Sequence, residues 1–523
     1  MKNVVAHVVL LALSSVVASG CSGSSDTSSI PPAKSTAPGD PNGTEEPAPG
    51  ATETPLPPGA QPAAFALAEG LAIHEIALFQ GVKVSMVKDG NPVAKTNAPI
   101  LAGRKGVLRV YVTPSASWDG REVVAELRIA SEGKTPTLLT DRKSLRARST
   151  DDVATSTFNF EIPAEALPAD AAFSIALTDA KAAATKPTGE SAALFPKDGT
   201  TTPMGLVPTG KLKLVIVPVR YDTDGSGRLP DVSASQLATY RNMMLRRYPA
   251  SDVEVTLHEP FPWTSTISRD GTGFSSILNA IVKLRQTDRA AADVYYYGVF
   301  APASSFGSFC QGGCVTGLSP VGQDPRDAFA RASVGHGYPG SESASTMAHE
   351  VGHAHGRNHA PCGGANGVDA SFPYSGGGIG VQGYDIVDRV FISASKGKDM
   401  MSYCPNLWVS DYTYTALHAR IAFVNGAKSF SAPASPGGYR LVAVENGVTT
   451  SVESVTLDDA PQGEPRAFTW VGGSGAAIGD GIARFYKYDH LEGGIYVIPE
   501  GGPSAMATSV RVAGLSGALV VKK

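Results

Sequence analysis

The chain has 523 residues, a formal net charge of −4 and 42% hydrophobic residues, enough for about three domains with buried cores. It carries no long basic run, which argues against nucleic acid as a partner. Only 18% of the residues are charged, while Gly and Pro number 57 and 38, and this favours a turn-rich β or mixed architecture over a helical bundle.

Residues 1–21 have the pattern of an export signal. Lys2 precedes an apolar run, residues 4–17, that is too short to span a bilayer comfortably. The ending ASGC resembles the lipobox of bacterial lipoproteins, which implies that Cys21 carries a lipid at the cell surface or outer membrane. An ordinary cleaved signal, with release from the cell, is the alternative. Residues 22–65 have almost no large apolar side chain and predict a disordered linker rich in Ser, Thr and Pro.

Three regions follow the linker. Residues 66–205 contain short β-type runs separated by Gly, Pro, Asp and Asn, which predict an antiparallel β-sandwich of immunoglobulin-like type. In residues 206–430 buried strands such as KLKLVIVPV alternate with helical patterns such as GFSSILNAIVKLRQ, so we expect an α/β layer on a partly parallel sheet. Residues 431–523 return to β runs and predict a small C-terminal β domain.

Residues 221–231, YDTDGSGRLPD, resemble the start of a calcium-binding loop. The oxygen-bearing side chains alternate and are followed by a glycine, at Asp222, Asp224, Ser226 and Gly227. The twelfth position is Ser233 where an EF-hand has Glu. A Ca²⁺ site therefore stands beside the alternative of an Asp/Gly-rich loop that caps a helix beginning near Ser233.

Four of the chain's ten histidines fall within residues 348–362, AHEVGHAHGRNHAPC. Residues 341–356 have the pattern of a helix that stops at Gly356. Its candidate N-caps are Ser341, Ser343 and Ser345.

The helical spacing of these histidines predicts which of them share a face. His353 lies about 40° around the helix axis from His349, so both imidazoles can bind one ion. Glu350 lies at the edge of that face, within reach of a water on the ion. His355 lies about 240° from His349 and is expected to point away.

A catalytic zinc ion takes three protein ligands and keeps one position for water. Gly356 permits the positive φ that lets the chain turn, so that His359 returns beneath the ion as the third ligand. The full pattern is H-E-x-x-H-x-x-G-x-x-H, and each fixed position has a separate mechanical task. It predicts one catalytic Zn²⁺ on His349, His353 and His359, with Glu350 as the general base.

This pattern resembles the metzincin clan of zinc endopeptidases. The resemblance implies a zincin catalytic domain and a tight turn carrying Met beneath the metal, and KGKDMMSYC, residues 396–404, is similar to that turn. Met401 is the implied floor residue; Met400 is adjacent, but only Met401 gives the Met-x-Tyr spacing. Tyr403 then stands where some metzincins have a Tyr that binds zinc or stabilises the intermediate.

The order of parts also resembles secreted bacterial mucin-degrading metalloproteases of the StcE type. This implies cleavage of mucin-type glycoproteins, with the substrate bound extended along an edge strand of the sheet. CVTGLSPVG (314–322) and RASVGHG (331–337) are the two candidate edges. His336, in the second segment, is expected at the surface or behind the metal ligands.

The remaining cysteines are Cys310, Cys314, Cys362 and Cys404, an even number in an oxidising compartment. Sequence alone does not fix their pairing. Cys310–Cys314 and Cys362–Cys404 are favoured because the last two flank the motif region; free buried thiols are the alternative.

These observations predict a monomeric, surface-tethered zinc endopeptidase that acts on extracellular proteins or glycoproteins. A glycan- or protein-binding surface lipoprotein with an inactive or secondary zinc site is the alternative from a different functional class.

Overall fold

The computed structural model describes residues 66–181, 191–426, 437–513, 515 and 517–521. The predicted signal with Cys21 and the predicted linker, residues 22–65, lie outside this range. The described chain is mixed α/β, with more strands than helices. No helix in these ranges is both long and apolar enough to cross a bilayer.

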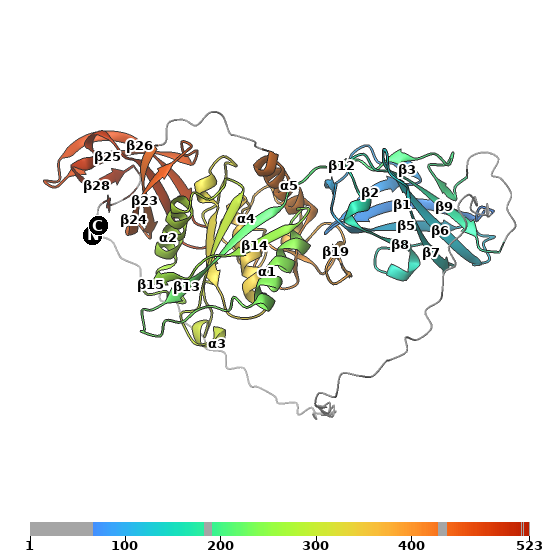
Figure 1. The fold of residues 1–523 in the computed structure, drawn as a ribbon, viewed down its shortest axis with the longest axis horizontal. Coiled ribbons are helices and arrows are strands. Elements are labelled where there is room, and N and C mark those ends of the chain that lie inside the picture. Colours follow the sequence, from blue (N-terminus) through green and yellow to red (C-terminus); the bar gives the residue numbers. More distant parts are fainter. Residues whose placement is uncertain (1–65, 182–190, 427–436, 514, 516, 522–523) are drawn as a thin grey trace, which may run out of the picture. The chain divides into compact units, whose positions relative to one another are not determined.

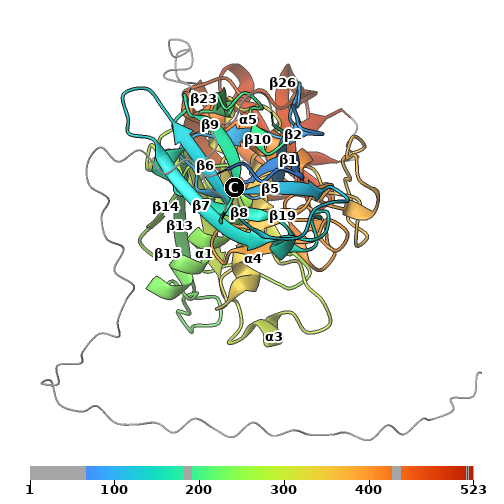
Figure 2. The ribbon, with the colours of Figure 1, turned by 90° about the vertical axis from the view of Figure 1, so that its right-hand side faces the viewer.

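Two antiparallel sheets near the N-terminus share one apolar core and lie face to face (Figure 2). The first has the order β3-β2-β1-β5-β8, and its strands are β1 (Leu71–Phe79), β2 (Lys83–Lys88), β3 (Asn91–Pro92), β5 (Gly106–Pro114) and β8 (Phe158–Ile162). The second consists of β6 (Glu122–Ala130), β7 (Thr137–Ser144), β9 (Ala172–Asp179), β10 (Leu194–Phe195) and β11 (Thr202–Pro203). The predicted antiparallel sandwich is therefore confirmed as two packed antiparallel sheets.

The central sheet has the order β14-β13-β16-β18-β17, and β15 pairs with the end of β13. All neighbours are parallel except β17, which runs antiparallel to β18 at the edge. The strands are β13 (Leu212–Tyr221), β14 (Val253–Leu257), β15 (Phe261–Trp263), β16 (Val294–Phe300), β17 (Gly317–Leu318) and β18 (Ala332–His336). The predicted partly parallel sheet is confirmed.

Helices cover both faces of this sheet (Figure 1). In β16, Tyr295 and Tyr297 belong to the core shared with α1 (Ala234–Arg247) and α4 (Ser341–Ala354). Tyr296, between them, belongs to the core shared with α2 (Phe274–Thr287). Alternate side chains of a strand point to opposite faces, so this strand is buried on both sides, as expected in a parallel sheet.

Several short elements and one 16-residue helix connect the larger ones. They are the parallel pair β4 (Ile100–Leu101) and β12 (Leu206–Val207), the hairpin of β19 (Gly383–Asp385) and β20 (Val390–Ile392), the parallel pair β21 (Lys398–Asp399) and β22 (Leu407–Trp408), and helices α3 (Phe306–Phe309) and α5 (Asp411–Gly426).

A seven-stranded antiparallel sheet ends the chain, in the order β24-β23-β27-β26-β25-β28-β29. Its strands are β23 (Gly437–Glu445), β24 (Val448–Leu457), β25 (Glu464–Gly472), β26 (Ala477–Lys487), β27 (Gly493–Pro499), β28 (Ala507–Val512) and β29 (Ala518–Val520). It packs against α2, where Asn279 donates to the carbonyl of Leu441, and the two share an apolar core. The three regions fall within the predicted ranges 66–205, 206–430 and 431–523, whose boundaries remain predictions.

The helix ends differ in part from the prediction. Ser233 caps α1 by accepting from the amide of Gln236 (3.3 Å), as expected. For α4 the serine caps were wrong, because Gly340 is the N-cap and its amide donates to the side chain of Gln236. Gly340 has φ 111°, which favours glycine over a side-chain cap at this position.

Candidate metal centre

Three histidines converge at the C-terminal end of α4. His349 and His353 lie one turn apart on the helix, which ends at Ala354 instead of the predicted Gly356. Gly356 follows two residues later with φ +84°. A Cβ on Gly356 would lie 2.8 Å from the carbonyl oxygen of Gly322, so both space and backbone angle favour glycine there. The turn brings His359 back, and Nε2 of His353 lies 3.0 Å from Nε2 of His349 and 3.1 Å from Nε2 of His359.

Backbone carbonyls fix the protonation of all three rings. Nδ1 of His349 donates to the carbonyl of Met400 (2.7 Å), and Nδ1 of His353 donates to that of Arg357 (2.6 Å). Nδ1 of His359 donates to the carbonyl of Asn366. Carbonyl oxygens only accept, so each proton sits on Nδ1 and each Nε2 presents a lone pair to the others.

Facing lone pairs at about 3 Å repel each other unless a cation lies between them. Nitrogen ligands about 2.0–2.1 Å from a tetrahedral ion would be about 3.3 Å apart, close to the spacing here. Burial lowers the pKa of His349 well below its ordinary value and that of His353 to about 3, and it also lowers the pKa of His359. Neutral imidazole is the form that binds metal, so the residues fit an ion at this point.

The Met-containing turn lies directly beneath the helix. A Cβ on Gly352 would lie 2.5 Å from Sδ of Met401, so the absence of a side chain at Gly352 lets the sulfur approach α4. The Met401 carbonyl accepts from the amide of Ala360, which ties the loop after His359 to the turn. Asp399 holds the turn, because its buried carboxylate accepts from the amide of Met401 (2.9 Å).

Glu350 and Tyr403 both contact His490, and Tyr403 also contacts His359. The Glu350 side chain is buried, and Oε1 lies 3.0 Å from Nε2 of His490, while Oε2 has no hydrogen-bond partner among the described residues. The Tyr403 hydroxyl lies 3.1 Å from Nε2 of His359 and also contacts Nδ1 of His490. The structure thus brings together His349, Glu350, His353, His359, Met401 and Tyr403.

Asp489 and His490 join this group from the turn between β26 and β27, and the sequence reasoning missed both. Oδ2 of Asp489 lies 3.3 Å from Nε2 of His353 and 3.0 Å from Nε2 of His490. Ligand atoms of these two residues and of the three motif histidines all lie within 4.8 Å of one another. The only sequence signal was the dipeptide Asp-His at the end of a β run, and nothing linked it to residues far earlier in the chain.

The two carboxylates and His490 shift one another's pKa. Burial and the charge of Asp489 raise the pKa of Glu350 well above its ordinary value. Burial would lower the pKa of His490, but the charges of Asp489 and Glu350 raise it to about 9. Burial opposes ionisation of Asp489, yet the positive charge of His490 holds its pKa below the ordinary value.

His355 stands apart from the centre, as expected. Its Nδ1 donates to the carbonyl of Val351 (2.7 Å), and its ring stacks on Tyr295 at a centroid distance of 4.3 Å. It is therefore a buried core residue on the other side of α4.

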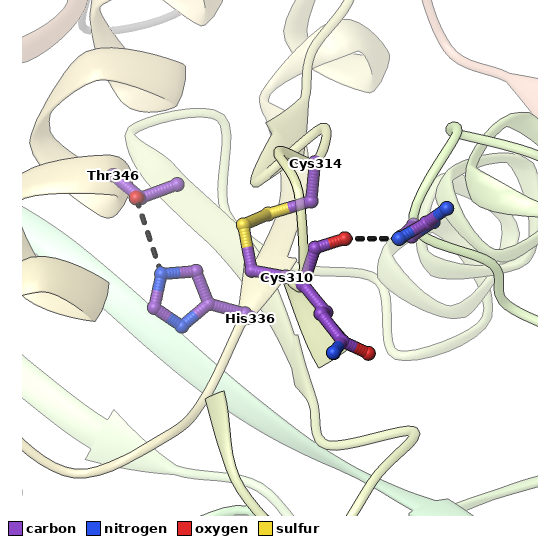
Figure 3. Close-up of a disulfide and its surroundings, with 6 residues drawn as sticks. Cys310, Cys314, His336 and Thr346 are labelled. Carbon is purple, nitrogen blue, oxygen red and sulfur yellow. Dashed lines mark hydrogen bonds between the residues drawn. A yellow bond between two sulfur atoms is a disulfide. The ribbon is translucent and has the colours of Figure 1, made fainter. Parts of the chain in front are cut away.

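His336 is not among the ligands, as expected; of its two expected positions the one at the surface was wrong, because the residue is buried. Figure 3 shows it turned toward Thr346 of α4, beside the Cys310–Cys314 disulfide. Its Nε2 lies 3.4 Å from Oγ1 of Thr346 and its ring packs on Phe306.

His336 predicts a pH dependence of stability. Burial lowers the pKa of its imidazole to about 4, from 6.5, so the unfolded chain gains a proton first as the pH falls. The neutral ring therefore supports the fold above pH 6.5, and that contribution is lost between pH 6.5 and 4. We expect His336→Phe to reduce the loss of unfolding free energy between pH 7 and pH 5 by about 2 kcal/mol, as measured by urea denaturation. Equal losses in both proteins would contradict this.

Both favoured disulfides are formed, Cys310–Cys314 and Cys362–Cys404. The second connects the loop after His359 to the chain just beyond Tyr403. It therefore holds the third histidine against the Met-containing turn.

Removing the Cys362–Cys404 bridge by a double Cys→Ser change is expected to lower the free energy of unfolding by about 4 kcal/mol, since it closes a long loop. The same change should weaken zinc binding, because the loop that carries His359 loses its tether. The matched control removes Cys310–Cys314, a four-residue separation, and should lose only about 2 kcal/mol with zinc affinity kept. Urea denaturation measures the unfolding free energy of both variants, and zinc titration measures their affinity. Equal zinc affinities in the two variants would contradict the role of the Cys362–Cys404 bridge at the metal.

The edge of the central sheet adjoins Glu350. Of the two candidate segments, 314–322 contains the edge strand β17, whereas 331–337 contains β18, which is an inner strand. A Cβ on Gly317 would lie 2.5 Å from Oε1 of Glu350. A cavity of about 440 Å³ opens beside this edge, and it is lined by residues that include Phe306, Thr316, His336, Thr346, Glu350 and Tyr403.

The Asp224 carboxylate is already engaged within the protein. It accepts from Ser226 and pairs with Arg228 at 3.0 Å. Within the described ranges, Asp222 and Asp224 do not belong to a group of three ligating side chains, and the loop leads into the helix capped by Ser233. Calcium binding stays a prediction without support from this geometry.

No protein-family model and no curated protein matches this chain. The function of the centre is therefore inferred from the geometry and chemistry of its own residues.

Proposed function

We propose that this protein is a zinc-dependent endopeptidase that hydrolyses extended segments of extracellular proteins or glycoproteins. One observation carries the proposal: three buried, neutral imidazoles present their Nε2 lone pairs to one point. The carboxylate of Glu350 lies 3.0 Å from His490, whose ligand atom is within 4.8 Å of theirs. A helix and turn with the metzincin pattern supply these groups.

The donor set favours zinc among the common metals, because imidazole nitrogens with a carboxylate are its usual ligands in hydrolases. A zinc ion held there would polarise the scissile carbonyl and bring the pKa of a coordinated water toward about 7.

The chain's own residues would handle protons and substrate. Glu350 would take the proton of the attacking water and deliver it to the leaving nitrogen. The Tyr403 hydroxyl would donate to the oxygen that becomes negative. The substrate backbone would pair with β17, next to Glu350, as an added strand.

Export fits the two disulfides, which persist in oxidising compartments. Attachment to a membrane through lipid on Cys21 is part of the same proposal, and so are a zincin fold and a monomeric state.

The test is cleavage of casein and of mucin by the zinc-loaded chain, with and without 1,10-phenanthroline. We expect cleavage that stops on chelation and returns with added zinc. Cut sites on glycosylated and deglycosylated mucin would show whether glycans are required. Zinc binding without chelator-sensitive cleavage, in the native chain and in the Asp489→Asn chain, would overturn the proposal and favour the binding lipoprotein.

A further inference from the structure

The turn after β26 lies along the route that a substrate would take. Beyond β17 the edge continues through residues 319–321, and residues 487–489 run antiparallel to it. The amide of Val321 donates to the carbonyl of Lys487 (3.0 Å), and the amide of Asp489 donates to the carbonyl of Ser319 (3.3 Å). An extended peptide added to a sheet edge makes the same kind of ladder.

This pairing carries Asp489 into the metal centre. Oδ1 accepts from the amide of Ser319 (3.0 Å), which fixes the carboxylate, and the side chain is fully buried. Oδ2 lies 3.3 Å from Nε2 of His353 and 3.0 Å from Nε2 of His490. A buried, fixed carboxylate oxygen at ligand–ligand distance from an imidazole is suited to bind the same ion.

His490 lies between two cavities at the metal centre. Its ring borders the 440 Å³ cavity that reaches His349 and Glu350, and it also borders a cavity of about 260 Å³ that reaches His353 and His359. Its Nε2 is 3.0 Å from Oε1 of Glu350, the group that must face the attacking water. A substrate that crosses the metal would meet this ring.

We propose that Asp489 and His490 form a plug: the Asp489 carboxylate fills the fourth metal position, and His490 fills the space before Glu350, so that the folded chain is latent. The consequence for proteolysis rests on the proposed function, whereas closure of the metal site does not.

The plug can withdraw without unfolding its sheet. The last ladder bond of the turn joins the amide of Tyr488 to the carbonyl of Gly493, and residues 489–492 lie beyond it. Tyr488 is buried in the core shared with α2, so the base of the turn stays in place. To open the site, the tip must move and break two backbone hydrogen bonds, from the Asp489 amide to the Ser319 carbonyl and from the Asn446 amide to the Glu492 carbonyl.

The test measures access to the metal directly. The full chain is loaded with Co²⁺, and the binding of acetohydroxamate, a small metal-chelating probe, is followed by the visible absorption of the ion. The variant combines Asp489→Ala with His490→Ala. We expect it to keep one ion per chain and to bind the probe about tenfold more tightly or better, because the native site is open only in a minor fraction of molecules.

Two further variants separate plugging from a general change in folding. Asp489→Asn keeps the acceptor for the Ser319 amide and should also bind the probe more tightly. Glu492→Ala removes an exposed carboxylate in the same turn and should behave as the native chain does. The same proteins, loaded with zinc, are then assayed on casein, and we expect the double variant to cleave about tenfold faster or more.

The outcomes distinguish this proposal from the proposed function. Tighter probe binding with no cleavage by any form supports the plug and overturns the endopeptidase. Chelator-sensitive cleavage by the native chain, with probe binding unchanged in the double variant, supports the endopeptidase and overturns the plug. Slower cleavage in the double variant also overturns the plug and assigns both residues a role in turnover. Neither effect in any variant overturns both proposals.

Discussion

Glu350→Gln is expected to lower the rate of peptide hydrolysis by about 10²–10⁴-fold, the usual worth of a positioned general base. Gln has the same length as Glu but cannot accept a proton from water. Oε1 of Glu350 accepts from His490, and a Gln oxygen can do so too, so the fold should remain. The measurement is kcat/KM on casein, with bound zinc determined on the same sample.

The control for this change lies far from the cavity. Glu132 is an exposed carboxylate just after β6, and it borders neither the cavity at Glu350 nor the ligand atoms, so Glu132→Gln should leave cleavage unchanged. Glu350→Gln protein that binds one zinc ion and cleaves as fast as the native chain would remove Glu350 from the reaction.

His359→Ala is expected to weaken zinc binding by more than about 100-fold, beyond the 10–100-fold that loss of an outer hydrogen-bond partner costs. The change removes one of the three imidazole ligands, and the two that remain on α4 do not supply the three protein ligands that a catalytic zinc ion takes. Competition with a chromogenic chelator measures the affinity.

His355→Phe is the matched control, since it removes a histidine of the same segment while keeping a ring against Tyr295. Its zinc affinity should stay within a few-fold of the native value. Equal losses of affinity in the two variants would show that the motif assigns the wrong histidines to the ion.

Local spacing predicted the centre well where one helix and one turn carry the residues. The angle between His349 and His353, the bend at Gly356 and the separate position of His355 all follow from helix geometry and the conformational freedom of glycine. The alternation of strands and helices likewise predicted the parallel sheet. The spacing of apolar residues differs between strands and helices, so the sequence shows where each begins.

Residues brought in by tertiary packing escaped the prediction. Asp489 and His490 arrive on a turn whose place depends on how the last sheet packs against α2. Arg109 is similar: it lies in a β-strand, yet it is fully buried, and one of the oxygens that accept from its guanidinium belongs to Gln382, far along the chain (2.8 Å). Such contacts leave no periodic signal in the sequence.

The central claim is that the three Nε2 atoms hold one zinc ion, and X-ray absorption at the zinc edge tests it most directly. For the full purified chain we expect one zinc per molecule with three nitrogen ligands at about 2.0–2.1 Å and one oxygen ligand at about 2.0–2.2 Å. The His359→Ala chain should lose this spectrum. A chain that binds no zinc, or a zinc spectrum that His359→Ala leaves unchanged, would contradict the claim.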